Sequence, residues 1–252
     1  MRALPTGWVV PISLSLVATF LSGCAAPRSG SYAVRDLSFQ RQLTESIVHE
    51  GPPGEQELLH STVVRVEPSP ALAAACKGRV DAVEETAWGG NGAPIRSRTH
   101  YCLDQAGYGH FAFEGHESET RRVYATKYEL LTDTRVGQSW SGVHGEGEKR
   151  NTRSCLAEST PFCVDGVATL CTTEYSTSIV WLRQHYCRGE GWRGFESVIV
   201  RSGEVAFVSW SRDVVADGTH FLNVDRPLPS AKQALDDLER IRTAIVRARE
   251  GK

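Results

Sequence analysis

The sequence predicts a mainly β protein of the α+β kind, with a short helix near residues 69–77 and a C-terminal helix over 230–250. From Ile95 to Val215 the chain repeats short runs of β-branched and aromatic residues, separated by Gly, Asp, Ser or Asn. Two other stretches carry the start signals of helices. The strands are short and closely spaced, so we expect an antiparallel sheet, a sandwich or a partly closed barrel.

The chain before Ile95 mixes both element types. Residues 35–49 could form a short helix, which "GPPGEQE" at 51–57 would stop. Residues 60–68 are typical of a strand. A Ser-Pro start and a following Gly predict a helix over 69–78, and the alternation over 79–88 predicts another strand.

Eight strands are expected in the β-rich region. They are, in chain order, "RSRTHYCL", "YGHFAFEG", "RRVYATKYELL", "SWSGVHG", "ATLCTTEYST", "SIVWLRQHYC", "RGFESVIVRS" and "EVAFVSWSRDV". The "RSGE" segment at 201–204 predicts a hairpin turn between the last two.

The C-terminal segment predicts an amphipathic helix. Ser230 and Gln233 have capping-box spacing, so the helix should start near Pro229. Apolar residues recur at steps of three and four, at Ala231, Ala234, Leu238, Ile241, Ile245 and Ala248. A coiled coil sustains its pattern for about three to four heptads. This shorter stripe favours packing on the sheet over a dimer seam.

The cysteine count predicts disulfides. Apart from Cys24 there are six cysteines, at Cys76, Cys102, Cys155, Cys163, Cys171 and Cys187. An even number in an exported protein, with no C-x-x-C spacing, favours three disulfides over metal ligation or free thiols. The two early cysteines lie apart from the other four. The expected local pairing is therefore Cys76–Cys102, Cys155–Cys163 and Cys171–Cys187.

The first two dozen residues resemble the export signal of bacterial lipoproteins. Met1-Arg2 is a positive start, and the mostly apolar run over 8–20 is too short for a membrane-spanning helix, which needs about 20 residues. The run ends in Leu21-Ser22-Gly23-Cys24, which resembles the lipobox. In that family the signal is cut before the cysteine, which is lipidated and acylated. The resemblance implies a mature chain that begins at a palmitate-bearing Cys24.

This resemblance also implies the domain organisation and the cellular location of the protein. It divides into a signal peptide over 1–23, a lipidated tether over 24–31 and a single β-rich domain over 32–252. Several acyl chains anchor a protein stably, whereas one alone binds only marginally. Ala25 stands where the family's inner-membrane retention signal often has Asp. We therefore expect anchoring in the outer membrane, facing the periplasm of the cell envelope.

The charge balance argues against a nucleic-acid partner. The chain has 28 basic and 30 acidic residues, for a net charge of −2. Removing Arg2 with the signal makes the net charge −3. The sequence shows no basic run or stripe, which nucleic-acid binding requires.

Two glycine motifs are close to known catalytic or cofactor loops. "GEGWRG" at 189–194 fits G-x-G-x-x-G, but a strand-like segment follows it where a dinucleotide site needs a helix, so a turn between strands is favoured. "GQSWSG" at 137–142 places its second glycine one residue too late for a nucleophile elbow, and no helix signal follows. The favoured reading is non-catalytic, so we predict no catalytic residue. If the protein is a hydrolase instead, Ser139 with His144 or His220 is the candidate set.

Metal and cofactor chemistry finds little support in the sequence. His144, Glu146 and Glu148 would share one face of an extended segment and could bind a divalent ion, but a solvated hairpin end is favoured. The acidic pairs Glu84-Glu85 and Asp236-Asp237 indicate solvated surface rather than an acid/base couple. We predict no metal and no other cofactor.

Aromatic residues late in the chain are candidates for a ligand cleft. They lie in or beside expected strands, at Trp140, Trp181, Trp192, Phe207 and Trp210. Aromatic side chains mainly build cores, although a minority line concave apolar sites. We therefore favour a core role for these five residues. An apolar ligand cleft is the alternative.

A second resemblance concerns the β-rich region. "VGQSW" at 136–140, followed by "YCRGEGWRGFES" at 186–197, resembles a pattern in β-rich bacterial envelope lipoproteins that are largely uncharacterised. In these proteins V-G-x-x-W opens a strand and the later glycine turn closes a hairpin. The likeness supports the sheet and implies no reaction.

The sequence therefore predicts a membrane-anchored envelope lipoprotein with a non-catalytic binding or assembly role. Its partner would be an envelope protein or an apolar ligand on the sheet. The anchor, the curved sheet and the helix are similar to those of lipoprotein carriers that hold acyl chains. An envelope hydrolase and a structural protein that oligomerises through the C-terminal helix are the alternatives.

Overall fold

The structure is a computed structural model that describes residues 31–33, 43–50, 56–88, 93–115, 121–144, 151–216, 219–222 and 228–250. The expected signal peptide, Cys24 and residues 34–42 lie outside the described residues. No helix in the described part of the chain is long and apolar enough to span a bilayer.

The described chain is built almost entirely of strands. They are β1 (Ser31–Ala33), β2 (Leu43–Glu50), β3 (Gln56–Val66), β4 (Arg79–Trp88), β5 (Ile95–Leu103), β6 (Gly107–Gly115), β7 (Arg121–Leu131), β8 (Asp133–Arg135), β9 (Ser139–His144), β10 (Asn151–Ser159), β11 (Gly166–Glu174), β12 (Ser178–Cys187), β13 (Gly191–Arg201), β14 (Glu204–Ala216) and β15 (Thr219–Leu222). The helices are α2 (Pro70–Ala75) and α3 (Ala231–Glu250).

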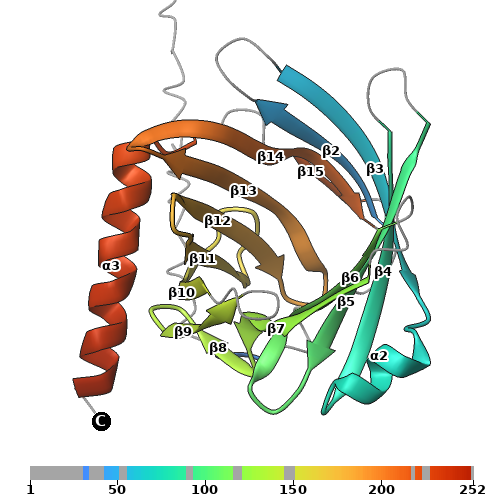
Figure 1. The fold of residues 1–252 in the computed structure, drawn as a ribbon, viewed down its shortest axis with the longest axis horizontal. Helices are drawn as coiled ribbons and strands as arrows, with labels where there is room; N and C mark the ends of the chain where they lie inside the picture. The colour runs from blue at the N-terminus through green and yellow to red at the C-terminus, as the bar shows by residue number, and fades with distance from the viewer. Residues whose placement is uncertain are drawn as a thin grey trace, which may run out of the picture.

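Thirteen strands form one antiparallel sheet that curls into a half-barrel (Figure 1). The strand order is β7-β6-β5-β4-β3-β2-β14-β13-β12-β11-β10-β9, and β15 also pairs with β14. Strands β1 and β8 form a separate two-stranded sheet. The two edge strands approach each other, since Trp140 Nε1 of β9 donates a hydrogen bond to the Tyr128 carbonyl of β7 across 3.4 Å. The partly closed barrel is therefore the form that the predicted sheet takes.

Alternate connections fall at opposite ends of the half-barrel, because consecutive strands are antiparallel. One end, called the open rim below, carries the connections that follow β2, β4, β6, β9, β11 and β13. The other end, called the closed end, carries α2 and the connections that follow β5, β7, β10 and β12. A cluster of buried residues fills the closed end, at Tyr32, Tyr108, Leu130, Ala157, Val167 and Tyr186.

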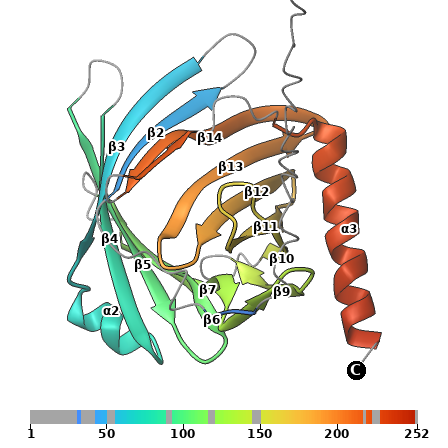
Figure 2. The ribbon, with the colours of Figure 1, turned by 180° about the vertical axis from the view of Figure 1, so that it is seen from behind.

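Both helices lie on the outer face of the sheet (Figures 1 and 2). The buried stripe of α3 packs on Leu156, Leu170, Trp181, Val198 and Val200 of the sheet. Leu72 of α2 packs with the Cys76–Cys102 disulfide. Ser230 and Gln233 form the predicted capping box, with the Ser230 N–H donating to Gln233 Oε1 and the Gln233 N–H donating to Ser230 Oγ.

Two predicted turns are confirmed. Ser202 and Gly203 have φ of 53° and 82° between β13 and β14, the paired positive values that a two-residue hairpin favours. The "GEGWRG" segment forms the turn between β12 and β13 and the start of β13, so it is not a phosphate loop.

One predicted element is wrong. Residues 43–49 belong to strand β2 rather than to a helix. This strand pairs on one side with β3 and on the other with β14, as Ile47↔Leu59 and Ser211↔Ile47 show. Two ladders of backbone hydrogen bonds override a weak local helix preference.

The disulfide pairing is partly corrected. Cys76–Cys102 is confirmed. The other two bonds are Cys155–Cys171 and Cys163–Cys187, in place of the expected local pairs. The reason is the register of the hairpin, which sets Cys155 of β10 directly opposite Cys171 of β11. Cys163, in the β10–β11 connection, then pairs with the last residue of β12.

Candidate functional site on the inner face of the half-barrel

The pairing register separates the two faces of the sheet. Directly opposite residues of neighbouring strands share a face, and successive residues alternate. Trp181 and Val198 are opposite each other beneath α3, which places them on the outer face. Their neighbours Val180 and Ile199 therefore face the inside of the half-barrel.

The inner wall carries an apolar row near the open rim. Val180 of β12 lies opposite Ile199 of β13, which lies opposite Phe207 of β14. All three side chains are half-buried, as are Leu182 and Phe195 further along the wall. Solvent thus reaches apolar side chains on the concave side of the sheet, as in a ligand-binding surface.

A buried polar network lies deeper on the same face. Arg153 Nη2 of β10 pairs with Glu129 Oε2 of β7 at 2.5 Å, and the two side chains are only 4% and 6% exposed. Gln184 Nε2 also donates to Glu129, across 2.6 Å, and Gln184 Oε1 accepts from Trp192 Nε1. The network connects β7 with β10, β12 and β13, so it holds the two halves of the curled sheet together.

Three tyrosines lie next to this network at the closed end. Tyr101 and Tyr108 stack with ring centroids 5.1 Å apart. Burial raises the pKa of the Tyr108 and Tyr186 phenols well above the ordinary value, and the Glu129 carboxylate raises that of Tyr186 further. Both phenols therefore remain neutral rather than act as bases.

Buried carboxylates mark the opposite wall. Asp81 of β4, whose side chain is 1% exposed, pairs with Arg79 at 3.0 Å and with Arg65. Glu85 lies four residues further along β4 toward the open rim. Burial raises the pKa of its carboxyl, and the Ser61 hydroxyl lowers it by a smaller amount. The inner face thus combines an apolar row near the rim with neutralised polar groups below it.

The five predicted cleft aromatics do not share one face. Trp181 and Trp210 lie on the outer face with Val198 and Glu196 opposite them. Trp181 is 1% exposed beneath α3. Trp140 and Trp192 pack against the closed-end cluster, and Phe207 belongs to the apolar row.

The predicted hydrolase candidates are not brought together. Ser139 begins β9 and His144 ends the same strand five positions later, which is a distance of about 17 Å along the strand. His220 lies in β15, which pairs with β14. Glu146 and Glu148 fall outside the described residues. Across the ranges that the structure describes, no three His, Cys, Asp or Glu side chains are grouped as metal ligands.

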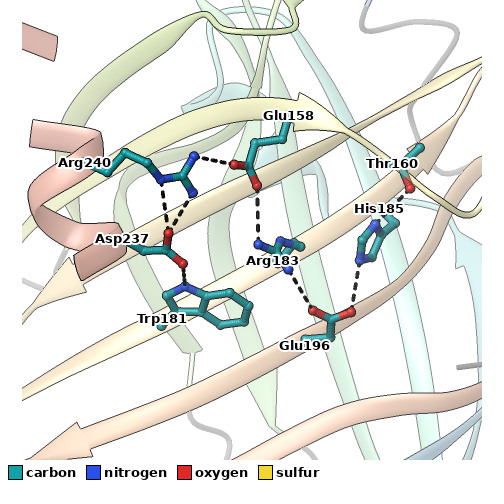
Figure 3. A network of polar contacts seen from close by, with 8 residues as sticks. All are labelled: Glu158, Thr160, Trp181, Arg183, His185, Glu196, Asp237 and Arg240. Carbon is teal, nitrogen blue, oxygen red and sulfur yellow. Dashed lines mark hydrogen bonds and ion pairs between the residues drawn. The ribbon is translucent and has the colours of Figure 1, made fainter. Parts of the chain in front are cut away.

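A second polar network lies on the outer face beneath α3 (Figure 3). Asp237 of α3 accepts hydrogen bonds from Trp181 and Arg240, and Arg240 also donates to Glu158 of β10. Arg183 of β12 continues the chain from Glu158 to the buried Glu196 of β13. Alternating positive and negative groups thus attach the helix to three strands.

The network ends in a hydroxyl, imidazole and carboxylate arrangement. Thr160 Oγ1 lies 2.9 Å from His185 Nδ1, and His185 Nε2 lies 3.4 Å from Glu196 Oε1. This order is similar to a nucleophile–base–orienter triad. His185 is fully buried, however, with the Phe162 ring against it at 4.3 Å, and Thr160 is only 9% exposed. A substrate from solution does not reach the imidazole, so the arrangement braces the closed end.

Most of these residues carry no signal in a single sequence. Glu129 and Arg153 meet only because β7 and β10 curl toward each other, and their sequence separation is 24. Glu85 and Asp237 were expected on solvated surface, but one faces the inside of the half-barrel and the other binds Trp181. The alternation of strand β4, which puts Glu84 and Glu85 on opposite faces, is the one pattern that could have indicated Glu85.

Comparisons with protein-family models, with curated proteins and with solved structures found no match to this chain.

Proposed function

We propose that this chain is a lipoprotein of the bacterial envelope, tethered through Cys24, whose half-barrel binds an apolar ligand such as an acyl chain. The observation that carries the proposal is the row Val180, Ile199 and Phe207 on the concave face. Half-buried apolar side chains on a concave surface are typical of sites for apolar ligands. The lipobox-like Leu21-Ser22-Gly23-Cys24 supports the anchor.

The position of polar groups supports the same binding mode. Two charged side chains described deeper in the half-barrel are neutralised by ion pairs, Glu129 by Arg153 and Asp81 by Arg79. They offer no free charge to a ligand. The apolar row near the open rim is therefore the surface where burial of an acyl chain contributes most, at about 0.8 kcal/mol per methylene.

The anchor is tested by metabolic labelling with radioactive palmitate. We expect the full chain to incorporate the label and the Cys24→Ser form to lack it. Equal labelling of both forms, or none in either, would contradict the lipoprotein assignment.

The ligand is tested on the Cys24→Ser form, secreted without lipid. Native mass spectrometry should show an adduct of lipid size that is lost on denaturation. Titration with a fluorescent 16-carbon fatty acid should then show saturable binding, weakened at least about tenfold by Ile199→Glu, because an unpaired charge would sit in the apolar row.

The matched control is Val246→Glu, at a position on α3 that is 50% exposed. It adds the same charge outside the half-barrel and should bind the probe as the parent does. The ligand proposal is contradicted if both variants lose probe affinity equally. It is also contradicted if the native mass is that of the protein alone and the probe does not bind, and either result points to a protein partner instead.

A further inference from the structure

The N-terminal strand fixes where the tether enters the fold. Strand β1 pairs with β8, which follows β7 at the closed end. Tyr32 is 2% exposed within the closed-end cluster, and the Arg188 guanidinium lies 5.0 Å above its ring. Asp165, from the β10–β11 connection, also hydrogen-bonds the Tyr32 phenol. Tyr32 is therefore held among three closed-end connections.

The tether is short compared with the half-barrel. Ser31 follows Cys24 by seven positions, and seven extended residues span at most about 25 Å. The strands β3, β7 and β13 have 11 residues each, which corresponds to about 36 Å. A barrel tilt of about 40° reduces this to a height of about 28 Å. Even a fully extended tether that ran along the wall would end short of the open rim.

We propose that the closed end faces the lipid bilayer that holds Cys24, and that the open rim points away from this membrane. This inference rests on the lipid anchor in the proposed function. It follows that a ligand enters and leaves on the aqueous side, through exchange with another envelope protein rather than directly with the anchoring bilayer.

The distribution of exposed apolar residues agrees with this orientation. Five large apolar side chains at least 37% exposed lie at the rim ends of their strands or in the adjoining connection, at Trp88, Ile95, Val143, Tyr175 and Val205. Two others, Val136 and Val164, lie at the closed end, so the rim carries the larger share of these exposed apolar groups among the described residues. Groups of exposed apolar side chains are a common feature of surfaces that dock other proteins. A rim directed away from the anchor would present them to such a partner.

The test places one fluorophore at each end of the full, lipidated protein. Val164→Cys labels the closed end at a position 80% exposed, and Val205→Cys labels the rim at a position 42% exposed. Each labelled protein is bound to vesicles of phosphatidylethanolamine and phosphatidylglycerol that contain a headgroup quencher. We expect the fluorophore at position 164 to be quenched at least about threefold more strongly than the one at 205.

Stronger quenching at position 205, or equal quenching at both, would overturn the orientation. Flotation of the same samples separates this outcome from failure of the anchor. If the lipidated protein floats with vesicles and its Cys24→Ser form does not, the anchor holds whatever the quenching shows. If neither floats, the anchor fails and the orientation fails with it.

Discussion

Trp181 Nε1 donates a hydrogen bond to Asp237 Oδ2 across 3.0 Å and joins the most buried indole of the sheet to the C-terminal helix. Asp237 also accepts from Arg240. The polar face of α3 is therefore part of the packing between helix and sheet rather than only a solvated surface.

Replacing Asp237 tests whether this side chain contributes to the packing of α3 or lies on a solvated surface. We expect Asp237→Ala to lower the free energy of unfolding by about 1–3 kcal/mol, because the buried Trp181 N–H loses its acceptor. Asp236→Ala is the control, since that side chain is 62% exposed and pairs only at the surface with Lys232; its cost should stay within about 0.5 kcal/mol. Urea unfolding, monitored by Trp fluorescence, measures the free energy of unfolding of both variants. Equal losses in the two variants would contradict the role of Asp237.

The disulfide pairing can be read from a digest without reduction. A protease that cleaves after acidic residues cuts at Glu158, Asp165 and Glu174, which separates the four later cysteines into different peptides. Mass spectrometry should find the Cys155 peptide joined to the Cys171 peptide, and the Cys163 peptide joined to the Cys187 peptide. Recovery of a Cys155–Cys163 link would show that the hairpin register is wrong.

Gly166 tests the packing of the closed end. A Cβ atom there would lie 2.4 Å from both Cys163 Sγ and the Tyr186 carbonyl oxygen. We expect Gly166→Ala to cost about 1–3 kcal/mol of stability through overpacking. Gly142→Ala is the control, because its Cβ would meet nothing within 4 Å, and thermal unfolding should change little. A tolerated Gly166→Ala would mean that the closed end is loosely packed.

The buried Arg153–Glu129 pair should show strong coupling. Arg153→Met alone leaves the Glu129 carboxylate buried without its cation, and we expect a loss of about 3–5 kcal/mol. Adding Glu129→Leu should recover most of that loss, because both charges are then removed. A double-mutant cycle by urea unfolding measures the coupling. Strictly additive effects would show that the two side chains do not interact.

Glu85 should make stability depend on pH. Burial raises the pKa of this carboxyl above 4.5 in the folded chain, so the stability it contributes is present below that value and is lost as the pH rises through the folded pKa. Glu85→Gln should therefore raise the unfolding midpoint at pH 7 and leave it unchanged near pH 3.5. Glu84→Gln, which loses an outer-face ion pair with Arg98, should show no such gain. A destabilised Glu85→Gln at pH 7 would contradict burial of the charge.

The sequence by itself determined the features that depend on neighbouring residues. The capping box at Ser230, the positive-φ turn at Ser202 and Gly203, and the alternating strands all follow from local chemistry that acts within a few residues. The mainly β fold class follows from these elements together. The lipobox-like stretch before Cys24 is also a local signal, and it stays a prediction.

Only the tertiary structure decided which segments meet. Residues 43–49 become strand β2 because β3 and β14 flank them. Cys155 pairs with Cys171 because a hairpin register sets them opposite each other. The curl of the sheet brings Glu129 to Arg153, and the docking of α3 brings Asp237 to Trp181. These three side-chain contacts join residues 16 to 56 positions apart, and their free energy depends on burial and geometry that no local pattern contains.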